Sequence, residues 1–308
     1  MGRRSKGRPV HGWLVLDKPQ GLTSTKAVSI VKRLADAAKA GHAGTLDPLA
    51  TGVLPIAFGE ATKTVPFVVD GTKSYRFTVA WGSETTTDDA EGEVLEESGA
   101  RPGRADVEGA LPAFTGEILQ VPPHYSAVKV EGQRAYDLAR DGEAFELKPR
   151  PVLIERLALV EHDAEGSSVL EADCGKGTYV RALARDLGRR LGCFGHVSVL
   201  RRTRVGPFTD SQTISLAKLQ EMSHSAAGRE AVLAALKPVE TALDDIPALA
   251  VSGSDAARLK RGQAVLMRGR DAPILEGPVY AMSRGLLVAL GEVQRGELRP
   301  TRVFNLQG

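Results

Sequence analysis

The segment GHAGTLDPLATG, from Gly41 to Gly52, contains the acid best placed for chemistry, Asp47. Gly41 and Gly44 permit backbone conformations that other residues avoid, and Pro48 stiffens the chain directly after the aspartate. The carboxylate therefore stands on a shaped loop, where it could act as a nucleophile or a base. The residues alone leave a second interpretation open, because an aspartate before proline also caps turns.

A second candidate is the glycine-rich stretch GKGTYVR at residues 175–181. A phosphate-binding P-loop needs a glycine at position 170, which is leucine here, and Ser or Thr at position 177, which is glycine. This excludes a nucleotide hydrolase of that class. Arg181, Arg185 and Arg189 recur every four residues, on one face of a predicted helix. Arg181 opposes the helix dipole in the first turn, which hints at an acidic partner, with an ordinary surface arginine as the alternative.

Charge is segregated along the chain, although the formal net charge is only +2. Seven acids and no base lie from Glu84 to Glu97. They lack the spacing of a metal site, so we expect an exposed loop there. Eight bases and one acid lie from Lys176 to Arg204. Such a cluster can neutralise phosphates, although a solvated helix face would have the same composition.

Composition excludes several classes of protein. The chain has no run of 18 apolar residues and no apolar signal core at its N-terminus, so we expect a cytoplasmic protein without membrane contact. Cys174 and Cys193 form no C-x-x-C motif, which fits a reducing compartment and argues against a structural metal site. No coiled-coil pattern or long apolar edge is present, so we expect a monomer and infer no protein partner.

The elements that must position these residues follow from the spacing of apolar side chains. We expect a strand from Gly12 to Pro19, a helix from residue 24 or 25 to about 40, a loop over 41–51 and strands near 53–58 and 72–82. Further strands are expected at 116–121, 125–130, 152–161 and 168–174, and helices at 104–112, 134–141 and 179–191. Because no regular βαβ repeat appears, the fold class is α+β.

A domain boundary is expected between about Asp244 and Ala250, around an Ile-Pro pair. The last 60 or so residues contain a short predicted helix at 255–261 and a hairpin from about 279 to 290. This pattern indicates a small, mostly β, barrel-like module.

Seven motifs carry a family resemblance. They are GWLVLDKPQGLTS (12–24), GHAGTLDPLATGVL (41–54), KSY (73–75), PPHYSAVK (122–129), GQRAYDLAR (132–140), GTYVR (177–181) and LRR (200–202). In this order they resemble the bacterial tRNA pseudouridine synthase B family, over residues 11–306 or so. The C-terminal LKRGQ (259–263) and LGEV (290–293) look like parts of a PUA RNA-binding module.

The resemblance implies a flexible basic arm at 1–10, a catalytic domain at 11–246 and a PUA-like domain at 247–308. The catalytic domain would have a central mixed, mainly antiparallel sheet flanked by helices and loops. The implied catalytic residues are the nucleophile Asp47, its partner Arg181 and Tyr75, which stacks on the target base. The other implied substrate-binding residues are His42, Tyr179, Leu200 and Lys63. A core leucine, a solvated lysine and core aromatics are the alternatives for Leu200, Lys63 and the two tyrosines.

The implied reaction converts the uridine of the TΨC loop of tRNA, position 55 by tRNA convention, into pseudouridine. The N-glycosidic bond breaks, the base turns and C5 rejoins the ribose, so no cofactor is needed. The carboxylate could attack C6 of the base or the anomeric carbon. A stacked uridine must first be extruded, and Tyr75 would replace stacking worth about 1–3 kcal/mol. The bases between 176 and 204 would then hold phosphates around the T arm.

Two other functions remain open from the sequence. One is a guide-RNA-dependent pseudouridine synthase, although the chain shows no long extension that would match that architecture. The other is a non-catalytic RNA-binding protein that helps tRNA to refold through the same groove.

Overall fold

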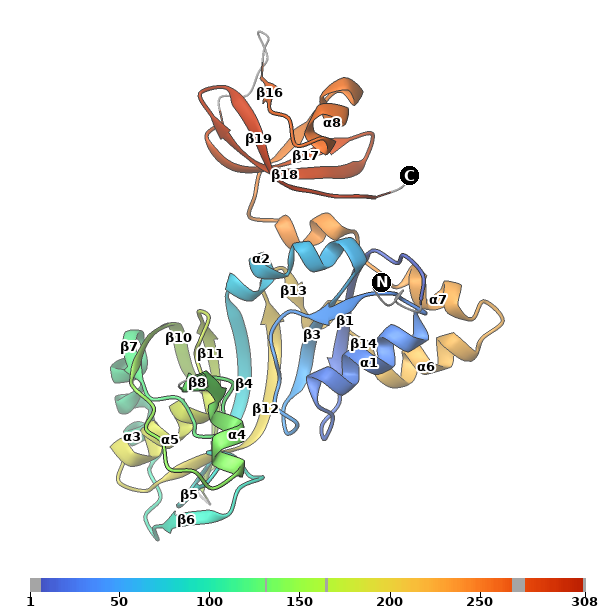
Figure 1. Cartoon of the computed structure of the whole chain (residues 1–308). Helices are drawn as coiled ribbons and strands as arrows, with labels where there is room; N and C mark the ends of the chain where they lie inside the picture. Colours follow the sequence, from blue (N-terminus) through green and yellow to red (C-terminus); the bar gives the residue numbers. More distant parts are fainter. Residues whose placement is uncertain (1–6, 131, 164–165, 268–274, 307–308) are drawn as a thin grey trace.

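The computed structural model of the chain describes residues 7–130, 132–163, 166–267 and 275–306. Figure 1 shows a large unit built around one long twisted sheet and a smaller unit that stands on one side of it. The basic arm expected at residues 1–10 is therefore described only from Gly7, and residues 1–6 lie outside the described part.

The large unit contains a ten-stranded sheet. Neighbouring strands follow the order β14 (Ile214–Ser215), β1 (Gly12–Lys18), β3 (Thr51–Phe58), β12 (Gly195–Val205), β4 (Lys73–Trp81), β11 (Ser167–Cys174), β10 (Arg150–Asp163) and β7 (Gly116–Gln120). Two short strands pair beside this path, β2 (Ala40–His42) with β3 and β13 (Phe208–Thr209) with β12. The β1–β14 and β3–β12 pairs are parallel and the others antiparallel, so the predicted mixed sheet is confirmed.

Helices flank this sheet and complete its core. They are α1 (Ser24–Leu34), α2 (Val65–Asp70), α3 (Arg104–Ala110), α4 (Ala135–Arg140), α5 (Val180–Arg190), α6 (Leu216–His224) and α7 (Arg229–Ala234). Helix α5 packs on β12 and β4, and its buried apolar side chains include Leu183 and Leu187. These elements are joined by short 3-10 helices in the described part of the chain, at 59–63, 111–114, 210–212 and 239–243. They are also joined by two small hairpins, β5 (Ser83–Thr85) with β6 (Val94–Glu97) and β8 (Lys129–Val130) with β9 (Gln133–Arg134).

Two predicted elements are wrong in extent. Helix α1 ends at Leu34 rather than near residue 40, because Asp36 adopts a left-handed φ of 48° and the chain turns back into β2. The strand expected at 125–130 is reduced to Lys129–Val130. The residues before it form a loop, which includes the buried residues Pro122 and Pro123. Proline has no N–H to donate to a strand ladder, so these two residues do not extend the strand.

The smaller unit is a five-stranded sheet covered by a short helix. The sheet order is β15 (Ala248–Ala250), β17 (Gly277–Ser283), β18 (Leu286–Gln294), β19 (Glu297–Val303) and β16 (Val265–Leu266), and the helix is α8 (Gly253–Lys260). The small, mostly β module predicted from the hairpin pattern is therefore present. Its identity as a PUA module stays a prediction.

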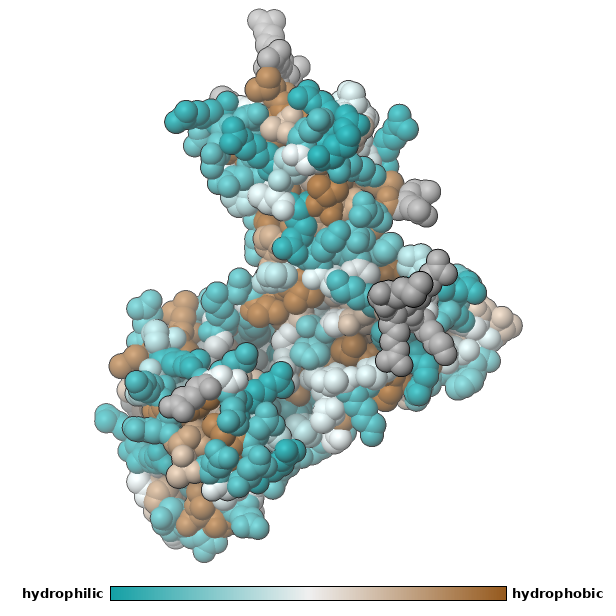
Figure 2. All heavy atoms as spheres, viewed as in Figure 1, coloured by the Kyte–Doolittle hydropathy of each residue, from teal (hydrophilic) through white to brown (hydrophobic). Residues whose placement is uncertain are grey.

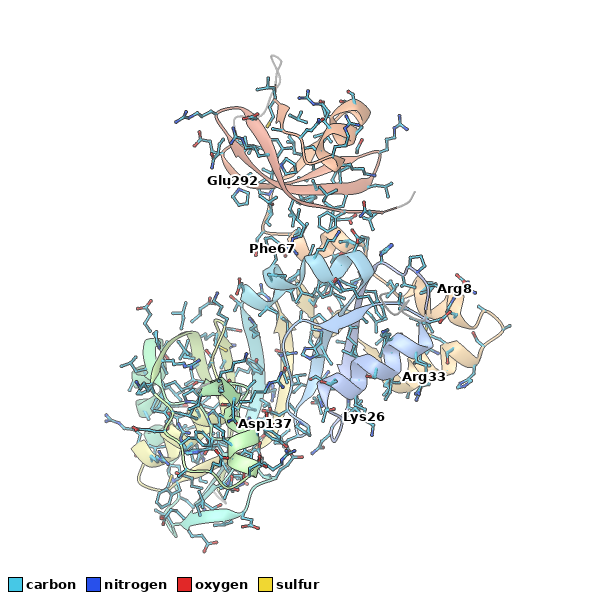
Figure 3. All side chains as sticks on the ribbon, in the orientation of Figure 1. Arg8, Lys26, Arg33, Phe67, Asp137 and Glu292 are labelled. Carbon is cyan, nitrogen blue, oxygen red and sulfur yellow. The ribbon has the colours of Figure 1, made fainter. Side chains whose placement is uncertain are left out.

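A shared apolar cluster joins the two units. Leu287, Leu290 and Phe304 of the smaller unit belong to the same buried cluster as Val68 and Phe208 of the larger one. Figure 2 shows hydrophobic residues at the surface around this narrow junction, and Phe67 lies beside it on α2 (Figure 3). Because this burial is continuous across the junction, the smaller unit is held against the body of the protein.

Two further observations concern the apolar character of the helices and the state of the two cysteines. No helix in the described part of the chain is both long enough and apolar enough to cross a membrane. Cys174 and Cys193 are buried free thiols.

Candidate active site

The loop that carries Asp47 connects β2 to β3, and the main chain on both sides of the aspartate is tied to neighbouring segments. Ser24, the first residue of α1, donates a hydrogen bond to the carbonyl of Leu46 (2.9 Å) and accepts one from its N–H (2.8 Å). On the other side, the Pro48 carbonyl accepts from the N–H of Gly21 at 2.8 Å. These contacts hold the aspartate in place from both directions.

Arg181 is the direct partner of Asp47. Its Nε lies 2.9 Å from Oδ2 of Asp47, and its side chain is 5% exposed whereas that of Asp47 is 37% exposed. Nη1 and Nη2 donate to the carbonyls of Thr87 (2.7 Å) and Tyr125 (2.9 Å), and Asp89 lies 3.6 Å from Nε. The acidic partner predicted for Arg181 is thus present. A carboxylate aimed at a buried guanidinium also fits a functional role better than a turn cap.

Tyr75 lies on β4, directly opposite Arg202 on β12. Its side chain is partly exposed, and burial raises the pKa of its hydroxyl while the Arg202 guanidinium acts in the opposite direction. The phenol therefore stays protonated at neutral pH. The Asp47 carboxylate raises the pKa of the Tyr75 hydroxyl further.

Tyr179 is held at the N-terminus of α5. The side-chain amide of buried Gln120 accepts from the Tyr179 N–H (2.8 Å) and donates to its carbonyl (3.1 Å). Burial raises the pKa of the Tyr179 hydroxyl, and Asp47 raises it further. Tyr179 thus lies close enough to Asp47 and Arg181 for both charges to act on its hydroxyl.

His42 ends β2, five residues before Asp47. Burial lowers the pKa of His42 and Arg202 lowers it further, so the ring is neutral at pH 7. Its Nδ1 is buried and has no hydrogen-bond partner among the described residues. A buried ring nitrogen left unpaired is suited to a hydrogen bond with a bound base.

Leu200 and Lys63 differ from these residues. Leu200 is 6% exposed and belongs to the main apolar cluster, as the core-leucine alternative predicts. Lys63 lies at the junction of the two units, where it donates to Glu60 (2.6 Å) and to the Val303 carbonyl (2.8 Å). Its ammonium also stands 5.6 Å from the centre of the Phe304 ring. The structure therefore does not bring Lys63 together with the Asp47 group.

The exposed acidic loop expected at 84–97 is wrong for its first half. Glu84, Asp88 and Asp89 are 5%, 6% and 2% exposed. They pair with successive arginines on one face of α5: Glu84 with Arg189, Asp88 with Arg185 and Asp89 with Arg181. Buried acids need such partners, because an unpaired buried charge is costly.

The same pairs correct the expected role of the basic stretch from 176 to 204. Arg181, Arg185 and Arg189 are engaged by protein carboxylates, and Arg201 pairs with Asp17 and Asp210. Charges already neutralised inside the protein contribute little to phosphate binding. The linear charge count therefore overestimates the phosphate-binding capacity of this stretch.

Sequence reasoning missed three residues of this site. They are Lys18 and Arg202, which contact the Asp47 loop, and Asp89, which faces Arg181. A signal was available for Glu84 and Asp88, which have the same spacing of four as the arginines of α5, but none for Asp89, which directly follows Asp88. For Lys18 and Arg202 the signal was only their position inside quoted motifs.

Lys18 gives a testable pH dependence of stability. It is fully buried and donates to the carbonyls of Pro19, Leu22 and Pro48. Burial lowers its pKa to about 8, against an opposing effect of Asp47. Between this value and the unfolded pKa of about 10.4, the unfolded chain binds more protons, so the free energy of unfolding rises with pH. At about 1.4 kcal/mol per pKa unit, the rise is on the order of 3 kcal/mol.

Denaturant unfolding of the wild type and of Lys18→Met at several pH values between 8 and 10.5 measures this rise. We expect it in the wild type and in the surface variant Lys26→Met, and we expect its loss in Lys18→Met. If the free energies of unfolding of the wild type and of Lys18→Met differ by a constant amount from pH 8 to 10.5, the lowered pKa of Lys18 is contradicted.

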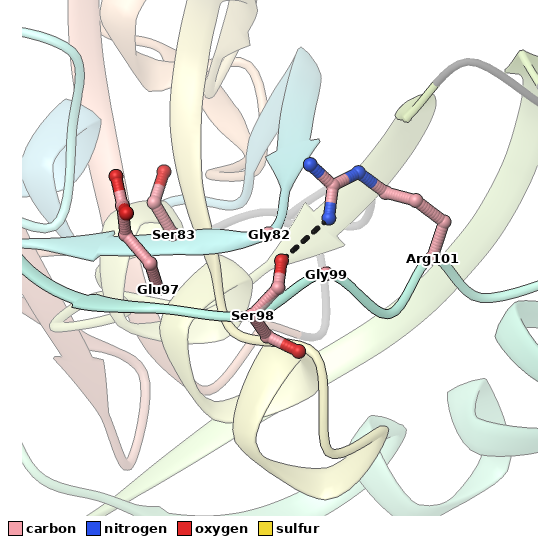
Figure 4. Close-up of a pocket in the computed structure, with 6 residues that line it drawn as sticks. All are labelled: Gly82, Ser83, Glu97, Ser98, Gly99 and Arg101. Atoms are coloured by element: carbon pink, nitrogen blue, oxygen red, sulfur yellow. Dashed lines mark hydrogen bonds between the residues drawn. The ribbon is translucent and has the colours of Figure 1, made fainter.

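A cavity of about 410 Å³ lies elsewhere in the large unit. It is lined by Gly82, Ser83, Glu97, Ser98, Gly99 and Arg101, and Arg101 donates to the Ser98 carbonyl at 2.8 Å (Figure 4). Gly82 follows the end of β4, whereas Tyr75 lies near its start, about 20 Å away at the usual rise per residue. The cavity is therefore separate from the Asp47 group.

Two family models match consecutive parts of the chain. The N-terminal domain of the TruB family pseudouridylate synthases matches residues 32–180, and the C-terminal domain of tRNA pseudouridylate synthase B matches residues 181–244. The chain belongs to the TruB family of pseudouridylate synthases. This TruB-family protein is accordingly an isomerase that forms pseudouridine.

Relatives match the TruB-family chain over almost its whole length. It is 66% identical to the tRNA pseudouridine synthase B of Rhodopseudomonas palustris over 99% of this chain and 84% of the relative. The tRNA pseudouridine synthase B of Caulobacter vibrioides is 56% identical over 99% of this chain and 100% of the relative.

Solved structures confirm the pseudouridine synthase fold. A chain of a Cbf5-Nop10-Gar1 complex matches with a TM-score of 0.72 and 27% identity, over 96% of this chain and 84% of that one. A chain of an H/ACA RNP bound to a substrate RNA containing 2′-deoxyuridine matches with a TM-score of 0.74 and 25% identity, over 99% and 92%.

Proposed function

We propose that this TruB-family enzyme acts on tRNA and isomerises the uridine of the TΨC loop, with Asp47 as its nucleophile. The pair of Asp47 with Arg181 carries the proposal, because a buried arginine, held by the carbonyls of Thr87 and Tyr125, contacts a carboxylate that is partly open to solvent. Relatives named tRNA pseudouridine synthase B support the choice of tRNA.

The arrangement fits the chemistry of this isomerisation. A neighbouring guanidinium favours the ionised form of a carboxyl, which is the form that attacks carbon. Attack at C6 of the base or at the anomeric carbon lets the N1–C1′ bond break, and a C5–C1′ bond then forms. The bond to the carboxylate breaks again, C5 loses its hydrogen as a proton and N1 takes up one proton, so electrons and atoms balance without a redox partner.

The extruded uridine would lie against the aromatic residues beside Asp47. Tyr75 offers a ring face that replaces the stacking lost on extrusion. Tyr179 closes the opposite side from the start of α5, and the neutral ring of His42 offers its unpaired Nδ1. Leu200 would contribute from β12, with Asp47 and Arg181 beneath the base.

Exposed bases near the Asp47 loop replace the arginines of α5 as the proposed phosphate contacts. Lys26 lies in the first turn of α1, two residues after the Ser24 that holds Leu46. Figure 3 places Lys26 and Arg33 on the outer side of this helix. Further exposed basic residues come after Tyr125 in the sequence, the residue whose carbonyl accepts a hydrogen bond from Arg181. They are Lys129, Arg134, Lys148 and Arg150.

We further propose that residues 11–246 form the catalytic domain and residues 247–308 a PUA-like RNA-binding domain. The separate sheet of the smaller unit supports this division. The junction contacts of Lys63 and Phe304 would hold the second domain at a constant position relative to the catalytic one.

Mapping of the product tests the proposed substrate. The purified chain is incubated with an unmodified tRNA transcript, and pseudouridine is located by carbodiimide treatment and primer extension. We expect one new stop, in the TΨC loop, and none in a transcript whose target uridine is replaced by cytidine. Modification elsewhere, or only after addition of a guide RNA, would refute the substrate. Improved tRNA refolding without any stop would instead identify a folding chaperone.

A further inference from the structure

Arg202 occupies the central position of three adjacent strands. On one side of β12 it is the register partner of Gly52, which follows the Asp47 loop in β3, and on the other side it is the partner of Tyr75 in β4. A register shift between Arg202 and Arg204 shows that the β12 ladder is irregular at this point. Such irregularities redirect side chains and are common beside active sites.

All three guanidinium nitrogens of Arg202 donate to carbonyls of the segment around Asp47. Nη2 donates to Gly44 (3.1 Å), Nη1 to Thr45 (3.2 Å) and Nε to Val53 (2.9 Å). These carbonyls lie on both sides of the aspartate in the sequence. One planar group therefore fixes the distance between the start and the end of the loop.

The strands themselves leave little freedom at this point. Gly52 has a φ of +96°, and a Cβ there would overlap the carbonyl oxygen of Arg202. Only glycine allows β3 to approach β12 this closely. This close approach of the two main chains fixes the backbone of Arg202 next to the end of the Asp47 loop.

Arg202 differs from the adjacent Arg201 in the partners of its guanidinium group. Arg201 is half-buried and forms ion pairs with Asp17 and Asp210. Arg202 is 2% exposed, and its three nitrogens contact main-chain carbonyls rather than a carboxylate. Tyr75, its cross-strand partner, and Asp47 both favour the charged form of Arg202, against the effect of burial on its pKa. Burying a cation in this way costs free energy that a neutral side chain would avoid.

We propose that Arg202 is a positioning residue that sets the Asp47 loop and the Tyr75 ring at the distance needed for the extruded base to reach the carboxylate. This inference rests on the proposed function. It gives Arg202 no contact with the RNA, so its loss acts on the chemical step and not on binding.

The matched variants Arg202→Lys and Arg201→Lys test the proposal. Lysine keeps the charge but has one nitrogen, which cannot reach three separated carbonyls and Tyr75 together. Misplacement of reacting groups by about 1 Å costs roughly 100-fold in rate, and this is the loss we expect in single-turnover assays of Arg202→Lys. Dissociation constants for tRNA should change by less than about threefold, and Arg201→Lys should retain nearly the wild-type rate.

A second readout separates positioning from a general structural effect. Tyr75→Phe removes the hydroxyl that favours the charged form of Arg202, so its rate loss and that of Arg202→Lys should be less than additive in the double variant. Fully additive losses, or an unchanged rate in Arg202→Lys, would refute the proposal. If Arg202→Lys does not fold, Tyr75→Phe alone must lower the single-turnover rate tenfold or so with binding unchanged, and a wild-type rate would refute it. An inactive wild type would instead refute the proposed function.

Discussion

Replacement of Asp47 by asparagine is expected to abolish pseudouridine formation. Asparagine has nearly the same shape, so the loop and its contacts to Ser24 should remain. The amide, however, is neutral and cannot supply the electron pair that forms the covalent bond. Single-turnover release of tritium from uridine C5 should fall by at least about 10⁴-fold, while tRNA affinity changes by less than about threefold.

The control for this change is Asp70→Asn. Asp70 forms an exposed ion pair with Lys176 at 2.9 Å, and such pairs contribute about 1 kcal/mol at most. This variant should therefore react at the wild-type rate. A smaller loss in Asp47→Asn than about 10⁴-fold would remove the aspartate from the proposed role.

Replacement of Arg181 by lysine has the second-largest expected effect. Lysine can pair with Asp47, but it cannot also reach the carbonyls of Thr87 and Tyr125 that hold the guanidinium in place. The carboxylate then loses its orientation and part of its electrostatic partner. We expect the single-turnover rate to fall roughly 100- to 1,000-fold, the range seen when one preorganised donor is removed from an active site.

Arg189→Lys is the matched control, because Arg189 lies on the same face of α5 and pairs with Glu84 at the far end of the helix. Its side chain is 54% exposed, so lysine can replace it at little cost. Equal rate losses in Arg181→Lys and Arg189→Lys would show that the arginines on this face of α5 stabilise the fold as a whole. A loss confined to Arg181→Lys would assign the effect to Asp47.

The parts of the fold that the sequence predicted are those set by local patterns. The strands β1, β3, β4 and β11 follow from apolar runs and alternation, and α5 from its spacing of apolar and basic residues. Asp47 stood out for the same reason, since glycines and a proline shape its loop. These features depend on residues close together in the chain.

The missed parts depend on contacts between distant segments. The strand β12 carries Arg201, Arg202 and Arg204, which read as a basic patch because its neighbours β3 and β4 lie more than 100 residues earlier. Likewise, Glu84 and Asp88 read as a solvated loop until α5 supplies Arg189 and Arg185. Charged residues inside a fold are recognisable only once their partners are known.

Lys63 shows the same limit in the opposite direction. Its sequence surroundings suggested a lysine near RNA, whereas its partners Glu60 and the Val303 carbonyl place it at the junction of the two units. The second partner is 240 residues away in the chain, so no local pattern could have indicated it.

Tritium release by the purified chain alone tests the central claim most directly. The substrate is a T-arm stem-loop with tritium at C5 of its target uridine, and no guide RNA, protein or cofactor is added. We predict complete release at one equivalent per RNA by the wild type and none by Asp47→Asn at saturating enzyme. Stoichiometric binding of this RNA without any release by the wild type would contradict the account.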